Sequence, residues 1–84
     1  MELTYSRSFK KDFKKLSQKL KVQFADRAEI FKINPYTEIL NNHRVHHPYE
    51  GCRSINISGD IRALYETAKN TIIFIRIGTH SELY

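Results

Sequence analysis

The sequence predicts a single α+β domain, residues 1–84, in which two N-terminal helices pack on one face of a small antiparallel sheet. Three observations support this fold class. The chain has 84 residues, a length typical of one domain. Apolar residues recur at helical spacing up to residue 33. From residue 52 onward apolar and polar residues alternate with a period of two, and β-branched residues become frequent. Both features are typical of strands.

A short strand at residues 2–5 is expected to lead into the first helix. Ser6 or Ser8 can cap the N-terminus of that helix. Four apolar residues then share one helical face: Phe9, Phe13, Leu16 and Leu20. Lysines occupy most of the remaining surface, so the helix is expected to pack through this apolar stripe.

A second helix is predicted to end at Asn34-Pro35, because proline disfavours helix in the residue before it and lacks an amide donor. No Gly or Pro separates the two helices, and we place the break between Ser17 and Lys21. Residues 36–51 are expected to form a long connection. The apolar stripe of the second helix contains Leu20, Phe24, Ala28 and Phe31.

Strand patterns follow this connection. Residues 52–66 alternate in character, with Ile55 and Ile57 on one face and polar residues on the other. Ser58-Gly59-Asp60 and Lys69-Asn70 supply turns, and "TIIFIRIGT", residues 71–79, is rich in β-branched residues. These strands are expected to form an antiparallel meander with one face covered by helices and the other open.

Alternation along the last strand predicts the direction of Arg76. It places Ile73, Ile75 and Ile77 on one face, and Ile72, Phe74 and Arg76 on the other. Because burying an unpaired guanidinium is costly, the face of Arg76 is expected to be the open one. His80 and Tyr84 are four residues apart, so one helical turn at the C-terminus brings them together, with Leu83 and Tyr84 holding that turn against the sheet rim.

Basic residues concentrate near the N-terminus. Residues 7–21 hold seven Lys or Arg and a single acid, Asp12, so this segment is more positive than the whole chain at net +5. Such a field favours a nucleic acid, an acidic protein or a membrane surface, while a solvated helix face is the simpler interpretation. The single Cys52, the lack of a long apolar run and the polar N-terminus predict a cytoplasmic protein with no membrane partner.

The chain resembles the RelE/ParE toxin superfamily, and specifically its YafQ-like mRNA interferase branch. The resemblance rests on "FKKDFKKL", "NNHRVHHPYEGCRS", "GDIRALYE" and the terminal "RIGTHSELY". It implies the toxin of a type II toxin–antitoxin system, an endoribonuclease that cleaves mRNA in the ribosomal A site without a metal or cofactor. It also implies three partners: a cognate antitoxin, mRNA and the 70S ribosome. The positive charge predicts that the antitoxin is acidic and lies across the sheet and the lysine-rich helix.

Matching the motifs implies five catalytic residues: His43, Asp60, Arg76, His80 and Tyr84. Cleavage through the 2′-OH requires a base, an acid and a cation that stabilises the phosphorane. We expect Arg76 to stabilise the phosphate, His80 to act as the acid, and His43 or Asp60 as the base. Tyr84 can stack on a nucleobase or donate its phenol. The expected RNA contacts are Lys10, Lys11, Lys14, Lys15 and Arg53.

One position departs from the family pattern. A histidine of the middle strand is replaced by Asn56, which cannot titrate, and His46 and His47 are candidates to compensate. This departure keeps open a catalytically weakened or non-enzymatic binding protein. A ParE-like inhibitor of DNA gyrase is a second alternative. A metal set of His43, His46 and His47 is a third, although it lacks Cys partners and standard zinc spacing.

The proposed catalytic residues also have simpler structural roles. Arg76 can form a surface ion pair with Asp60 or Glu66. Asp60 is a favoured turn residue. His80 can cap the end of the last strand, and Tyr84 can close the core.

Overall fold

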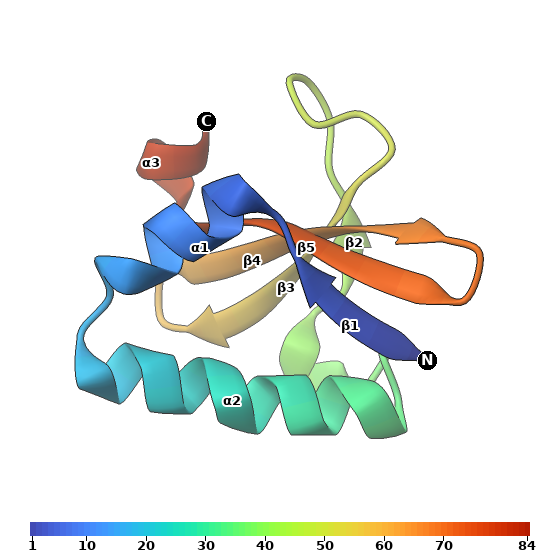
Figure 1. The fold of residues 1–84 in the computed structure, drawn as a ribbon, viewed down its shortest axis with the longest axis horizontal. Coiled ribbons are helices and arrows are strands. Elements are labelled where there is room, and N and C mark those ends of the chain that lie inside the picture. Colours follow the sequence, from blue (N-terminus) through green and yellow to red (C-terminus); the bar gives the residue numbers. More distant parts are fainter.

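The computed structural model describes residues 1–84 as one α+β unit. Its elements are β1 (Glu2–Tyr5), α1 (Arg7–Lys14), α2 (Gln18–Ile33), the 3₁₀ helix η1 (Glu38–Leu40), β2 (His43–Arg44), β3 (Arg53–Ser58), β4 (Ile61–Ala68), β5 (Thr71–Thr79) and α3 (His80–Leu83). The five strands form one sheet in the order β1-β5-β4-β3-β2. Figure 1 shows α2 along one side of this sheet, and α3 with the loop that follows β2 on the other. The predicted fold class is confirmed.

The two N-terminal helices begin at serine caps, as their sequences predict. The Ser6 hydroxyl accepts a hydrogen bond from the Phe9 amide at 3.0 Å, and that of Ser17 accepts one from Leu20 at 3.2 Å. The break covers residues 15–17 and so lies at the start of the expected range. Leu16 and Leu20, predicted on the face of the first helix, therefore lie outside α1. Both helices bury their aromatic stripes against the sheet in one core cluster, which contains Phe9, Phe24, Ala28, Phe31, Leu40, Ile55, Ile57, Ile61, Ala63, Tyr65, Ile72, Phe74 and Ile77.

A second, smaller cluster lies outside this main core. It contains Val45, Cys52, Leu64 and Leu83, with Tyr49 and Ile75 packed against it. The loop after β2 and the C-terminal turn are therefore fixed to the sheet by apolar contacts. The sheet face that was expected to be open is consequently covered in part.

The predicted alternation along β5 is wrong for part of the strand, because a β-bulge interrupts it. Tyr65 pairs with Phe74 and Leu64 pairs with Arg76, which leaves Ile75 as an extra residue. Phe74 is consequently buried in the main core, while Ile75 packs against the second cluster. Ile72 and Ile77 also lie in the main core, so Ile72 and Phe74 are not on an open face.

Two pairings at the sheet edges complete the fold. β1 runs parallel to β5, whereas every other pair is antiparallel. The connection at residues 36–51 contains regular structure: η1 and the two-residue strand β2, whose His43 pairs with Ser54 of β3.

None of the helices has the length and apolar character needed to cross a membrane.

Candidate active site

Two distant parts of the chain meet in a pocket of about 280 Å³ between β2, the loop that follows it and α3. Three predicted catalytic residues, His43, His80 and Tyr84, line this pocket together. The full lining is His43, Arg44, Val45, His46, His47, Ser54, His80 and Tyr84. We call it the histidine pocket. Its surface offers imidazoles, a phenol and a guanidinium to a ligand.

A capping box holds the C-terminal turn beside this pocket. The Thr79 hydroxyl accepts a hydrogen bond from the Glu82 amide at 3.2 Å, and the Glu82 carboxylate accepts one from the Thr79 amide at 2.8 Å. Leu83 is buried in the second cluster. The rings of His80 and Tyr84 lie 4.7 Å apart between centroids. The predicted docked helical turn is therefore confirmed.

The Thr79→Ala variant is expected to loosen this turn, because an N-cap hydroxyl contributes about 1 kcal/mol. Hydrogen bonds from Thr79 lower the pKa of Glu82, so its stabilising effect is present above the unfolded-state pKa and is lost as the pH falls through the folded-state pKa. We therefore expect weaker protection of the Leu83 and Tyr84 amides from exchange, relative to the intrinsic exchange rate at each pH, in the variant at neutral pH and in wild type under acid. Glu82→Gln, which keeps an acceptor, is the control. Unchanged exchange in Thr79→Ala contradicts the assignment.

Arg76 does not line the histidine pocket; it lines a separate pocket with Asp12 and Lys15, and two partners hold it. Its Nε and Nη2 donate to Asp12 Oδ2 and Oδ1 at 2.6 and 3.2 Å, and its Nη1 donates to the Tyr49 hydroxyl at 2.9 Å. Asp12 Oδ2 also accepts the Ile77 amide at 3.1 Å. The Asp12 carboxylate raises the pKa of Arg76, so the guanidinium stays charged. The ion pair expected with Asp60 or Glu66 is wrong, since the partner is Asp12.

Tyr49 joins Arg76 to the tail. Its ring packs edge-on against that of Tyr84, with 5.9 Å between centroids. Burial raises the pKa of Tyr84, which keeps its phenol protonated near neutral pH. A continuous series of contacts thus runs from Asp12 on α1 through Arg76 and Tyr49 to the aromatic pair on α3.

The hydrogen bond of His43 defines its neutral tautomer. Its Nδ1 lies 2.7 Å from the carbonyl oxygen of Asn41. A carbonyl only accepts hydrogen bonds, so Nδ1 carries the proton and the lone pair of the neutral ring is on Nε2. The Nε2 atom is therefore the one available to accept a proton.

The predicted catalytic residue Asp60, and Asn56 at the position that departs from the family pattern, do not line the histidine pocket. Asp60 is exposed in the β3–β4 turn and makes no hydrogen bond or ion pair with another site residue. The next residue, Ile61, pairs with Thr79, so Asp60 lies at the same end of the sheet as α3. Asn56 lies on β3, where its buried Oδ1 has no hydrogen-bond partner.

The expected RNA-binding residues do not line one common pocket. Lys15 lines a pocket beside Arg76, whereas Lys10 and Lys14 line another between α1 and α2, and Lys11 is exposed. Arg53 donates through Nε to Asn42 Oδ1 at 2.7 Å and stacks over the ring of Tyr36. Its side chain therefore supports the connection before β2.

Three residues that the motifs did not single out also belong to the site: Asp12, Arg44 and Tyr49. Two of the three have a signal in the sequence that could have identified them. Asp12 is the only acid among the basic residues 7–21, and Arg44 directly follows His43. Tyr49 carries no such signal, because its role depends on how its loop folds back.

No group of three or more His, Cys, Asp or Glu side chains is arranged to hold a metal ion, and the alternative set of His43, His46 and His47 is therefore not formed. Cys52 is buried behind the site in the second cluster. Burial raises the pKa of its thiol, which keeps it protonated and unreactive.

Helices on one sheet face, with a histidine-bearing C-terminal turn docked at the other, form a fold that is similar to that of a solved YoeB/ParE toxin. The chain belongs to the YafQ toxin family, because the family model described as a bacterial toxin of a type II toxin–antitoxin system, YafQ, matches residues 1–84. Both the predicted superfamily and its YafQ-like branch are confirmed.

Solved structures agree with this assignment at the level of the fold. YafQ from E. coli strain BL21(DE3) superposes with a TM-score of 0.75 at 22% identity, over 99% of this chain and 97% of that one. YafQ in the E. coli DinJ–YafQ complex gives 0.73 at 23% identity, over 99% and 97%. A YoeB/ParE toxin from Agrobacterium tumefaciens gives 0.78 at 16% identity, over 95% and 99%. No curated protein sequence matches this chain significantly.

Proposed function

We propose that this toxin is an endoribonuclease that cleaves messenger RNA in the ribosomal A site. The observation that carries the proposal is the meeting of His43 and His80, from β2 and α3, in one pocket with Tyr84. Two imidazoles in one site can supply both a base and an acid near neutral pH. Membership of the YafQ toxin family supports the same conclusion.

The tautomer of His43 favours it over Asp60 as the base. Its Nε2 accepts the 2′-OH proton, and the 2′ oxygen then attacks the adjacent phosphorus. His80 donates a proton to the departing 5′ oxygen as the P–O5′ bond breaks, which leaves a 2′,3′-cyclic phosphate. Positioned acid–base groups of this kind contribute about 10²–10⁴-fold to the rate. Tyr84, with its protonated phenol, donates a hydrogen bond or stacks against a nucleobase.

Arg76 stabilises the phosphorane as the charge develops. A guanidinium has five N–H groups, and Asp12 and Tyr49 occupy only three of those of Arg76. The remaining N–H groups are free for phosphate oxygens, while Asp12 and Tyr49 hold the plane of the group. Arg44 on the wall of the histidine pocket adds a second cation. Lys15, beside Arg76, and the exposed Lys11 extend the positive track toward the RNA backbone.

We also propose that an antitoxin holds this protein inactive. E. coli YafQ forms a toxin–antitoxin complex with DinJ in a crystal structure. A chain of net +5 favours an acidic partner. The product of a small neighbouring open reading frame with an acidic C-terminal half is therefore expected to co-purify with this protein and to relieve its growth arrest.

Ribosomes translating a defined mRNA in a reconstituted system test the nuclease proposal. We expect cuts within the translated frame that require ribosomes and end in 2′,3′-cyclic phosphates. Because Asn56 does not line the histidine pocket, Asn56→His is expected to change the rate by less than about tenfold. Intact mRNA together with gyrase-linked DNA breaks in expressing cells contradicts the proposal and indicates a ParE-like poison instead.

A further inference from the structure

The histidine pocket contains one polar group that the proposed cleavage mechanism does not use, the hydroxyl of Ser54. Ser54 is only 3% exposed, and every other buried residue of the chain is hydrophobic or aromatic. It nevertheless lines the pocket together with His43, His80 and Tyr84. Burying a hydroxyl without a hydrogen bond is costly, so its presence at this position requires a physical reason.

The pairing of the strands places Ser54 beside the proposed base. Ser54 of β3 is opposite His43 of β2 on one side and Leu64 of β4 on the other. Leu64 is in turn opposite Arg76 of β5. Residues directly opposite each other project from the same face of a sheet, with Cβ atoms about 4.5–5.5 Å apart. The proposed base, Ser54 and the proposed phosphate-stabilising guanidinium therefore belong to one row across the sheet.

The Ser54 hydroxyl has no hydrogen-bond partner in the chain. The side-chain atoms that are both fully enclosed and unpaired are Arg27 Nε and Asn56 Oδ1, and the Ser54 oxygen is not among them. An unpaired oxygen that is not enclosed has to reach the pocket that its residue lines. The protein around it is apolar, since Val45 and Leu64 belong to the second cluster. Its hydrogen-bond partner therefore has to enter from the pocket.

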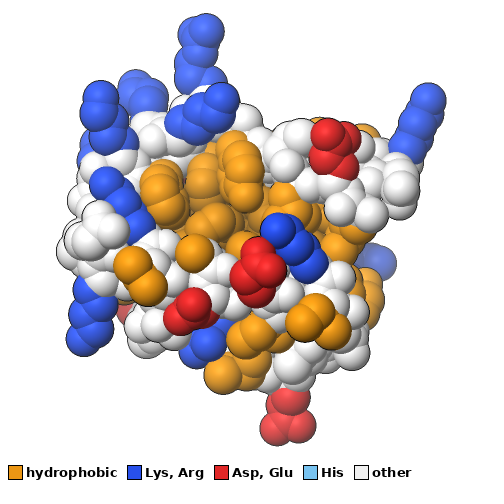
Figure 2. Space-filling view, turned by 60° about the horizontal axis from the view of Figure 1, so that its bottom comes forward, with side chains coloured by type: hydrophobic (Ala, Val, Ile, Leu, Met, Phe, Trp, Pro, Cys, Tyr) orange, Lys and Arg blue, Asp and Glu red, His pale blue; other side chains and the backbone are white.

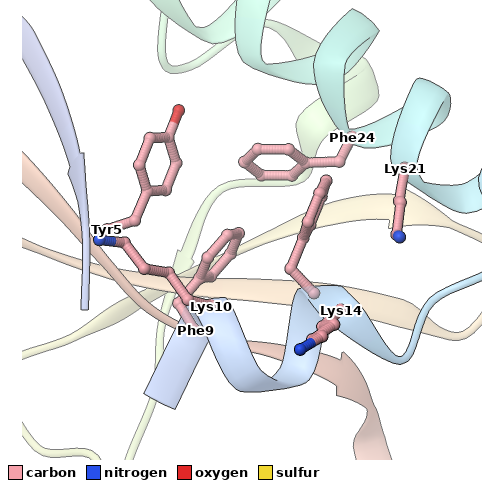
Figure 3. Close-up of a pocket in the computed structure, with 7 residues that line it drawn as sticks. Tyr5, Phe9, Lys10, Lys14, Lys21 and Phe24 are labelled. Carbon is pink, nitrogen blue, oxygen red and sulfur yellow. The ribbon is translucent and has the colours of Figure 1, made fainter. Parts of the chain in front are cut away.

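A larger pocket, of about 530 Å³, lies between β1, α1 and α2 and has a different character. It opens on the helix-bearing face, where Figure 2 shows hydrophobic side chains gathered. In Figure 3, Tyr5 from β1 and Phe24 from α2 approach it from different sides, above Phe9 of α1. We call it the aromatic hollow. No histidine lines it, so a hydroxyl beside imidazoles distinguishes the histidine pocket from it.

The ligand group that fits Ser54 and His43 together is one that donates one hydrogen bond and accepts another. In its neutral tautomer His43 presents only an acceptor, Nε2. The Ser54 O–H can donate at the same time. A phosphate oxygen only accepts, so it leaves the lone pair of His43 without a partner. The ribose 2′-OH both donates and accepts, and it is the group by which a protein distinguishes RNA from DNA.

We propose that Ser54 binds and orients the 2′-OH of the nucleotide on the 5′ side of the cleaved bond. The Ser54 hydroxyl donates to the 2′ oxygen, while the 2′-OH donates to His43 Nε2. During cleavage the 2′-OH proton moves to His43 and the Ser54 proton stays on Oγ. The hydrogen bond from Ser54 strengthens as the 2′ oxygen gains negative charge. This inference rests on the proposed function, and it names the residue that makes the site selective for ribose.

Titration of the ¹⁵N-labelled protein with dinucleoside monophosphates tests this inference in the absence of ribosomes. The probes are ApA and UpU, each with ribose or 2′-deoxyribose in the 5′ nucleotide. We expect the wild-type protein to bind the ribose form about tenfold more tightly with either base, and Ser54→Ala to reduce this preference to about twofold. Removing the 2′-OH from the 3′ nucleotide instead is the ligand control and is expected to change the affinity little.

Matched variants distinguish ligand binding from a structural role. Ser58→Ala is the control, since Ser58 lies on the same strand but does not line the pocket, and it is expected to keep the full ribose preference. Ser54→Thr restores a hydroxyl on a side chain that suits a strand, and is expected to recover most of the preference. Ser54→Ala is expected to have a Tm no lower than wild type, because the unpaired hydroxyl contributes no hydrogen bond to the fold. A lower Tm with an unchanged ribose preference overturns the proposal.

Cleavage on programmed ribosomes gives a second measurement. Ser54→Ala is expected to lower kcat about tenfold and to leave KM nearly unchanged, because the hydroxyl aligns the attacking oxygen and adds little to the binding of the ribosome. Failure of the wild-type protein to cleave RNA contradicts the proposed function but leaves the ribose preference as evidence for the 2′-OH site. Equal binding of both sugars by the wild-type protein overturns the inference. So does a loss of affinity in Ser54→Ala that depends on the base and not on the sugar, which assigns the hydroxyl to the nucleobase.

Discussion

If His80 is the general acid as proposed, the His80→Ala variant is expected to cleave mRNA about 10²–10⁴-fold more slowly than wild type. His80 is exposed at the start of α3, and the hydrogen bonds that cap this turn come from Thr79 and Glu82. The fold and the position of Tyr84 are therefore expected to survive. Single-turnover cleavage on programmed ribosomes measures the loss, and growth arrest on expression is expected to disappear with it.

Ser81→Ala is the matched control, since Ser81 is an exposed neighbour in the same turn. It is expected to cleave at the wild-type rate. If His80→Ala retains both cleavage and growth arrest, His80 is not the acid, and the roles assigned to the histidine pocket have to be abandoned.

Asp12→Ala is expected to lower the free energy of unfolding by about 2 kcal/mol, which corresponds to roughly 10 °C in Tm for a domain of this size. The change removes a carboxylate that accepts two hydrogen bonds from Arg76 and one from the Ile77 amide. The side chains of Arg76 and Asp12 are only 29% and 16% exposed, so water replaces these bonds incompletely. Thermal and urea unfolding measure the loss.

A double-mutant cycle distinguishes the ion pair from separate effects at each residue. Arg76→Ala is expected to destabilise by a similar amount, because it leaves the Asp12 carboxylate unpaired. The double variant is expected to lose less free energy of unfolding than the sum of the losses in the two single variants. Asp26→Ala, at an exposed acid of α2, is the control and is expected to change stability by less than about 0.5 kcal/mol. Strict additivity contradicts a direct pairing.

The Asp12 variant also has a kinetic consequence. In the proposed mechanism, the guanidinium of Arg76 is then no longer held in one plane and meets the phosphorane less often in the productive orientation. We therefore expect cleavage to fall through kcat more than through KM. A pure loss of stability, with normal kcat in the folded protein, indicates that Asp12 has a structural role only.

Local patterns in the chain predicted most of the helices, strands and turns. The aromatic stripes, the break near Ser17 and the stop at Asn34 all depend on neighbours within a few residues. The same is true of the turns at Gly59 and Lys69. Spacing of four residues also predicted that His80 and Tyr84 share one side of the terminal turn.

Contacts between distant residues determined the rest of the site. The bulge at Ile75 depends on the register of two strands, and it alters which side chains face the helices. Asp12 and Arg76 are 64 residues apart, and nothing in the local sequence of either residue indicates the other. Tyr49 reaches Arg76 and Tyr84 only because its loop folds back onto the second cluster.

The amino-acid pattern thus specified most of the elements, the inward face of β3 and the histidine-bearing tail, because periodicity and capping act over one or two turns of chain. The packing of those elements specified the partners of Arg76, the placement of Arg44 in the histidine pocket and the open aromatic hollow between the helices. These features depend on register and on the angles at which elements meet. Such quantities are set by the whole core and are not encoded in any short segment.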